Sequence, residues 1–188
     1  MNPALDCRQQ MQTALLGRPA ACAALSDPLR PLLASLLTGR SLKQGVLTAT
    51  LGLPPDTFEA LWQHYFPGDP LQLQHGPGED MVELDDLLQL LLEYRAGVYA
   101  SEAWLAHIVA HSYCGRNHLW QDLGLANRGE LSLLMNTAFP ALAALNVGDM
   151  KWKKFIYRHY CAREGIYVCP APSCGECSDY SKCFAKEE

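Results

Sequence analysis

The sequence predicts an all-α fold, a single helical domain followed by a short cysteine-rich loop at the C-terminus. Apolar residues recur at three- and four-residue steps along most segments, as they do on one face of a helix. The alternation of apolar and polar residues that is typical of strands is absent. We place the helical domain at residues 1–165 and a cysteine-rich, cluster-binding tail at residues 166–188.

Helix-start and helix-stop residues divide the domain into elements. The predicted helices cover residues 5–16, 29–37, 41–52, 57–66, 81–94, 101–114 and 149–164. Ser41 is a candidate N-cap of a short helix that ends at Gly52, because glycine commonly stops helices. Asp56 is an expected N-cap with Glu59 as its capping-box partner, and Asn127 is expected to start a later helix.

The later helices show clearer apolar faces. Leucines 84, 87, 88, 91 and 92 share one face of the segment 81–94. Ser101 is expected to open the segment 101–114, which ends before a glycine. In the segment 149–164, the predicted buried face consists of Trp152, Phe155, Ile156 and Tyr160.

Composition limits the class of protein. The 188 residues are 49% hydrophobic and 19% charged, which is enough apolar surface for a sizeable core. No run of about 18 apolar residues occurs, so we expect no membrane span. The net charge of −5 argues against a general nucleic-acid-binding function. We expect a cytoplasmic location, because the start of the chain does not look like an export signal.

The last twenty residues contain four cysteines in the pattern C-x4-C-x2-C-x5-C: Cys169, Cys174, Cys177 and Cys183. Four thiols in a short stretch with proline and glycine are typical of a loop that folds around a thiophilic metal. Thiolates select zinc, copper(I) or iron–sulfur clusters. Zinc ribbons usually pair two C-x2-C motifs, and only one is present here. The longer spacings favour a metal–sulfur cluster, as in the C-x4-C-x2-C segment of plant-type ferredoxins.

Disulfides and structural zinc are the alternatives for these thiols. The chain has eight cysteines, an even number, but a domain of this length does not need disulfides for stability. Cys7 and Cys22 lie outside any ligand-like spacing, and Cys22 is expected to be a small buried hydrophobic residue.

A second group of candidate ligands lies upstream. His107, His111, Cys114 and His118 are spaced by four, three and four residues, and would share one face if a helix continued through Gly115. The alternative is that Gly115 ends the helix and that the histidines are solvated or cap helices.

The segment 149–164 leads directly to the cysteines and carries several cations. Lys151, Lys154, Arg158 and Cys161 follow one face at helical steps. A solvated basic face is one explanation. The other is that these cations stabilise an anionic cysteine-ligated cluster, with Cys161 as a fifth candidate thiol ligand.

Two stretches of the sequence resemble the NifQ family of nitrogen-fixation proteins. One is Met150-Lys-Trp-Lys-Lys-Phe-Ile-Tyr-Arg158 with the cysteine pattern after it, and the other is His118-Leu-Trp-Gln-Asp-Leu-Gly-Leu125. The resemblance covers about residues 103–184. It implies a molybdenum–iron–sulfur cluster that supplies molybdenum for the iron–molybdenum cofactor of nitrogenase, with Cys169, Cys174, Cys177 and Cys183 as its ligands.

The resemblance also implies partners, namely the nitrogenase iron protein, the cofactor scaffold complex, and molybdate or another molybdenum source. The competing functions are an iron–sulfur redox carrier or sensor and a zinc-stabilised interaction module. An enzyme is not expected, because the sequence has no nucleophile elbow, no glycine-rich phosphate loop and no convincing acid–base pair.

Overall fold

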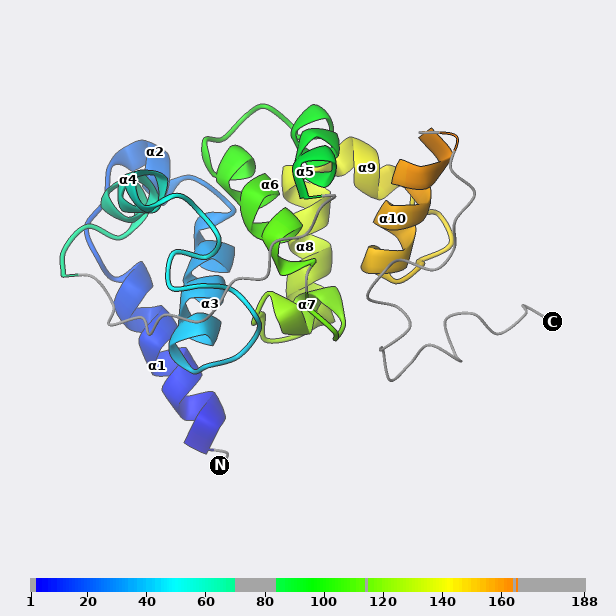
Figure 1. The fold of residues 1–188 in the computed structure, drawn as a ribbon. Helices are drawn as coiled ribbons and strands as arrows, with labels where there is room; N and C mark the ends of the chain where they lie inside the picture. The colour runs from blue at the N-terminus through cyan, green and yellow to red at the C-terminus, as the bar shows by residue number, and fades with distance from the viewer. Residues whose placement is uncertain (1–2, 70–83, 114, 164, 166–188) are drawn as a thin grey trace.

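The computed structural model describes residues 3–69, 84–113, 115–163 and 165 (Figure 1). Its helices are α1 (Pro3–Leu16), α2 (Cys22–Leu25), α3 (Arg30–Ser41), α4 (Pro55–Tyr65), α5 (Leu84–Glu93), α6 (Ser101–Ser112), α7 (Leu119–Asp122), α8 (Arg128–Ala138), α9 (Pro140–Ala144) and α10 (Trp152–Arg163). The described residues contain no strand, which confirms the all-α class. The predicted tail, residues 166–188, lies outside them. No described helix is both long and apolar enough to span a bilayer.

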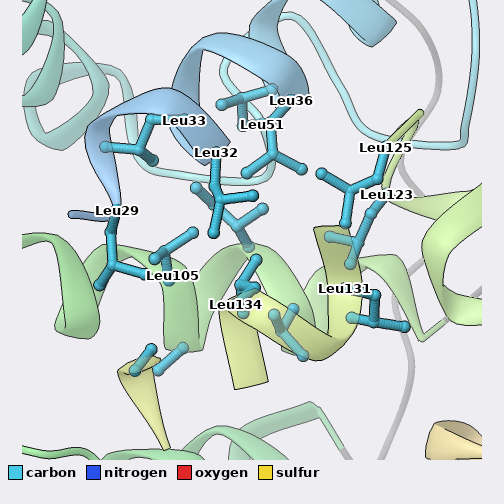
Figure 2. Packing of buried hydrophobic residues seen from close by; sticks show 14 of the residues in the cluster. Leu29, Leu32, Leu33, Leu36, Leu51, Leu105, Leu123, Leu125, Leu131 and Leu134 are labelled. Atoms are coloured by element: carbon cyan, nitrogen blue, oxygen red, sulfur yellow. The ribbon is translucent and has the colours of Figure 1, made fainter. Parts of the chain in front are cut away.

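Leucines from successive helices form one hydrophobic core. Figure 2 shows Leu29, the N-cap of α3, and Leu33 of α3 near Leu105 of α6 and Leu134 of α8, and all four are buried. Burial of a leucine side chain stabilises a fold by about 1.5–3 kcal/mol, so this cluster is the main source of stability. Three of the four residues predicted on the buried face of the last helix, Trp152, Phe155 and Ile156 of α10, are buried as expected, and Tyr160 is partly buried.

A buried arginine satisfies the ends of two helices. Arg30, at the start of α3, donates hydrogen bonds to the carbonyl oxygens of Leu16 (3.1 Å), Arg18 (3.0 Å) and Tyr65 (3.1 Å). Carbonyl groups at helix ends lack partners within their own helix, and a fork of N–H donors provides them. Arg30 thereby fixes the ends of α1 and α4 against α3.

Close backbone contact joins α3 to the turn after α7. A Cβ atom on Gly39 would collide with the carbonyl group of Gly124, and one on Gly45 would collide with the backbone of Asp122. The amide of Val46 donates to the carbonyl oxygen of Asp122 at 2.8 Å. Glycine is required where two backbones approach this closely. The connection after α3 therefore lies directly on α7.

Two expected helix starts are wrong. Ser41 is the last residue of α3, and its hydroxyl donates to the carbonyl oxygen of Leu37, so residues 42–52 form turns rather than a helix. Asp56 is the second residue of α4, because Pro55 occupies the first helical position and holds Pro54 in an extended conformation. Asn127 does cap α8, accepting the amide of Glu130 at 3.0 Å.

Cys22 is exposed, which corrects the expectation that it is buried. It begins α2, a helix of four residues in which only Ala24 is buried. A helix of four residues has room for few side chains that face the core, and in α2 the residue that faces it is Ala24.

Candidate functional site

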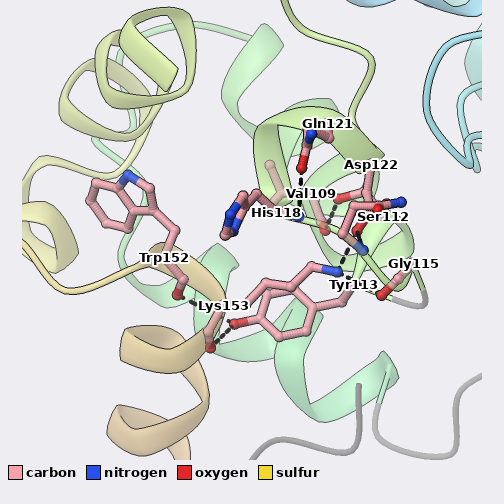
Figure 3. A network of polar contacts seen from close by, with 10 residues as sticks. Val109, Ser112, Tyr113, Gly115, His118, Gln121, Asp122, Trp152 and Lys153 are labelled. Carbon is pink, nitrogen blue, oxygen red and sulfur yellow. Dashed lines mark hydrogen bonds and ion pairs between the residues drawn. The ribbon is translucent and has the colours of Figure 1, made fainter. Parts of the chain in front are cut away.

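The first turn of α10 is anchored in the body of the protein by a buried lysine. Lys153 has only 8% of its surface exposed. Its ammonium donates to the carboxylate of Asp122 at 2.5 Å and to the carbonyl oxygen of Gly115 at 2.7 Å (Figure 3). A buried ammonium requires partners of this kind, because loss of hydration is otherwise very costly. This ion pair fixes where the helix that precedes the cysteine-rich residues begins.

The carboxylate of Asp122 is fully buried at the end of α7. Besides Lys153, it accepts the backbone amide of Asn117 at 3.1 Å and the side-chain amide of Asn117 at 3.3 Å. A Cβ atom on Gly115 would collide with this carboxylate, so glycine makes room for it. The connection between α6 and α7 is therefore folded around one negative charge.

Tyr113 holds the backbone of the same lysine. Its hydroxyl donates to the carbonyl oxygen of Lys153 at 2.5 Å, and the Lys153 ammonium lies 5.8 Å from the centre of its ring. The ring face attracts the cation weakly at that distance. Tyr113 and Gly115, the two neighbours of Cys114 in the sequence, thus both contact Lys153. Cys114 itself lies outside the described residues.

Of the two alternatives for the histidines, the structure supports the one in which the helix ends before Gly115, and it contradicts a continuous face. α6 ends at Ser112, and His118 is the N-cap of α7, so the helix does not run through Gly115. His107 and His111 remain one turn apart on α6. The physical reason is the buried carboxylate of Asp122, which occupies the space beside Gly115 and turns the chain into α7.

The histidines have different surroundings. His107 is half-buried, and burial lowers the pKa of its imidazole. His111 packs against Gly52, where a Cβ atom would collide with its ring. His118 begins α7, and its amide donates to the side-chain oxygen of Gln121 at 3.1 Å. Within the described residues, no three His, Cys, Asp or Glu side chains are grouped to hold a metal ion.

The predicted cysteine ligands lie mostly outside the described residues. These are Cys114, Cys169, Cys174, Cys177 and Cys183. Cys161 is described: it lies on α10 and is buried with 4% of its surface exposed. Arg158, three residues earlier on the predicted basic face, is exposed.

Sequence reasoning missed the Asp122–Lys153 pair. It assigned no role to Lys153, although the residue is adjacent to Trp152 and three positions before Ile156 on the apolar side of a helix. That position was the available signal for burial. Asp122 had a similar signal, because buried leucines lie on either side of it at positions 119 and 123.

Comparison with known proteins identifies the family. The NifQ family model matches residues 32–185. The chain belongs to the NifQ family. It is 38% identical to the NifQ protein of Azotobacter vinelandii over 165 residues, which cover 79% of this chain and 85% of that protein. It is 39% identical to that of Rhodobacter capsulatus (76% and 80% covered) and 37% identical to that of Klebsiella pneumoniae (75% and 89% covered). No solved structure matches the chain.

The NifQ match covers both the buried ion pair and the cysteine pattern. Residues 32–185 include Asp122 on α7, Lys153 on α10 and all four cysteines of the C-terminal pattern. Membership of this family places the chain in nitrogen fixation. The two stretches that resembled NifQ proteins in the sequence, around residues 118–125 and 150–158, are the ones that the buried ion pair joins.

Proposed function

We propose that this protein carries a molybdenum–iron–sulfur cluster and donates molybdenum for assembly of the nitrogenase iron–molybdenum cofactor. One observation carries the proposal: the NifQ match extends to residue 185 and so includes the complete C-x4-C-x2-C-x5-C pattern. Cys169, Cys174, Cys177 and Cys183 are the proposed ligands, because thiolates bind iron–sulfur clusters preferentially.

The cluster is cargo in this proposal, and the protein is a carrier rather than an enzyme. Molybdate or another molybdenum source would supply the metal, and the nitrogenase iron protein and the cofactor scaffold complex would be its partners. The anchored start of α10 supports such a role. The buried Asp122–Lys153 ion pair attaches the helix that precedes the cysteines to the protein body.

The histidines and two further cysteines are proposed as secondary ligands for the molybdenum corner. His107, His111 and His118 offer imidazole, and Cys114 and Cys161 offer thiolate. Imidazole is harder than thiolate, so a mixed ligand set would hold molybdenum and iron differently and favour release of one. Burial lowers the pKa of half-buried His107, which favours the neutral imidazole, the form whose lone pair can bind a metal.

Metal analysis after purification without oxygen tests the proposal. We expect molybdenum together with iron and acid-labile sulfide. Iron and sulfide without molybdenum would identify an iron–sulfur redox carrier or sensor instead, and zinc alone would identify an interaction module. Either result overturns the proposal.

Variants locate the cluster. Cys174→Ala should lose iron and molybdenum while far-UV circular dichroism stays unchanged. Cys22→Ala is the matched control, because this thiol is exposed and outside the ligand spacing, and its metal content should equal that of the parent. Normal iron content in Cys174→Ala would remove this residue from the ligand set. A lower Mo:Fe ratio in His107→Ala or His118→Ala would support the histidine ligands, and an unchanged ratio in these two variants and in His111→Ala would exclude them.

A further inference from the structure

A polar hollow of about 500 Å³ opens beside α7. Its walls come from α1, from the connection after α3, and from α7 with the turns on either side. Its polar side chains are Arg8, Gln44, Asn117 and Gln121. None of the described residues that line it is acidic. Arg8 is therefore the only charged residue among its described lining residues.

The orientation of Gln44 is fixed by its neighbour. Its side-chain oxygen accepts a hydrogen bond from Nη1 of Arg8 at 2.5 Å. A guanidinium only donates, so the oxygen of Gln44 must face it and the NH2 group must point elsewhere. That NH2 group has no hydrogen-bond partner among the described residues. Gln44 thus offers two N–H donors at the rim of the hollow.

Gln121 is oriented in the same way from the opposite wall. Its side-chain oxygen accepts the backbone amide of His118 at 3.1 Å, and an amide N–H only donates. Its NH2 group also lacks a partner among the described residues. The side-chain oxygens of Gln44 and Gln121 are therefore both hydrogen-bonded within the protein, and their NH2 groups are available at the same pocket.

Arg8 provides the positive charge at this pocket. The residue is 93% buried, and its Nη2 donates to the carbonyl oxygen of Gly124 at 2.6 Å and to the hydroxyl of Ser35 at 3.1 Å. Its Nε is buried and has no hydrogen-bond partner among the described residues. The carboxylate of Glu130 interacts with the charge of Arg8, and it accepts the hydroxyl of Ser35 at 2.6 Å and the amide of Ala126, a lining residue, at 2.8 Å.

We propose that this pocket binds a small tetrahedral oxyanion through the amide groups of Gln44 and Gln121 and the charge of Arg8. Charge-assisted and neutral N–H donors are the chemistry that recognises such anions. In neutral water, molybdenum(VI) is the tetrahedral dianion molybdate. The identification of the anion as molybdate rests on the proposed function; the oxyanion site itself does not.

Calorimetric titration of the cluster-free full chain with sodium molybdate tests the site, with sodium sulfate as the second anion. Saturable molybdate binding is expected. Gln44→Glu and Gln121→Glu each replace the NH2 group by a charged oxygen while the oxygen that is engaged in the protein stays in place. Each should weaken binding at least about tenfold, because like charges at a contact are strongly unfavourable. Gln89→Glu, on the exposed face of α5, should bind as the parent does.

The outcomes separate the site from the function. Equal affinity in the parent and both glutamate variants, or no saturable binding of either anion, overturns the pocket. Binding of sulfate as tightly as molybdate, with the same response to Gln44→Glu, keeps the oxyanion site and overturns molybdate as its ligand. Gln121→Glu could lose molybdate binding and still carry a normal molybdenum–iron–sulfur cluster when molybdenum is supplied in bound form. That result would support the pocket and leave the proposed function intact.

Discussion

The two ends of α10 are attached to the protein in opposite ways. At its start, Lys153 pairs with Asp122, and both side chains are out of water. At its last residue, Arg163 pairs with Glu93 of α5 through two hydrogen bonds, and both side chains are about half exposed. Both contacts are ion pairs between residues far apart in the sequence.

The difference lies in the cost of breaking each pair. Removing one member of a buried pair leaves an unhydrated charge, whereas members of an exposed pair return to water at little cost. The start of α10 is therefore fixed, and its end is held only loosely by charge. The cysteine-rich residues follow the loosely held end in the sequence.

Loss of the lysine should have the largest effect. Lys153→Ala leaves the Asp122 carboxylate buried without its cation, and we expect a loss of about 3–5 kcal/mol in the free energy of unfolding. Urea unfolding followed by circular dichroism measures it. Arg158→Ala, an exposed cation on the same helix, is the control and should change stability little. The double variant Asp122→Asn/Lys153→Met should recover much of the loss, because it removes both charges together.

A methyl group at Gly115 should have the next largest effect. Gly115→Ala places a Cβ atom against the Asp122 carboxylate, and overpacking of this kind costs about 1–3 kcal/mol. In an Asp122→Ala background the collision disappears, so a double-mutant cycle should show strong coupling between the two positions. Gly148→Ala is the control, since its Cβ atom would meet open space. Additive effects of the two substitutions would contradict the predicted contact.

Acid should weaken the middle of α10. Burial, with a smaller contribution from Arg163, lowers the pKa of His159 below its ordinary value of 6.5, and its Nε2 lies 3.0 Å from the Tyr94 hydroxyl. The unfolded chain then binds the proton more readily than the folded protein. Stability from His159 is present above pH 6.5 and falls as the pH drops through the folded-state pKa. Unfolding free energies measured between pH 7.5 and 5.5 should decline less steeply in His159→Gln. An identical slope in parent and variant would show that His159 does not contribute.

Breaking the exposed pair should have the smallest effect. Arg163→Ala should leave the unfolding midpoint nearly unchanged, because both partners are already well hydrated. The hydrogen bond from Arg163 lowers the pKa of Glu93, so the variant should raise that pKa toward 4.5. An NMR titration of the Glu93 carboxyl group measures the change. A large loss of stability would show that the exposed end anchors α10 as firmly as the buried end.

The sequence was sufficient to predict most helices, because their apolar stripes are long and regular. It failed at residues 42–52, where the serine that looked like a helix start ends α3. Close contact with the backbone around Gly124 determines that connection, and no local pattern records a contact with a residue 80 positions away. The cap at Asn127 was predictable because it depends only on residues three positions apart.

The candidate site was predictable only in part for the same reason. The cysteine spacing and the two NifQ-like stretches could be recognised in the sequence, but the pairing of Asp122 with Lys153 could not. Single charged residues within apolar segments do not identify their partners. The break in the histidine face at Gly115 also depends on Asp122, which no spacing of the histidines reveals.

Arg8 has a practical consequence for anyone choosing where to cut this chain. It belongs to α1, before the NifQ match begins at residue 32, yet it provides hydrogen bonds to Ser35 and Gly124 within the match. A chain that began at residue 32 would keep the whole NifQ match. The carbonyl oxygens of Ser35 and Gly124 would nevertheless lose the hydrogen bonds that Arg8 donates. Glu130 would likewise lose its electrostatic interaction with Arg8. Truncations, fusions and chimaeras of this protein should therefore start ahead of α1.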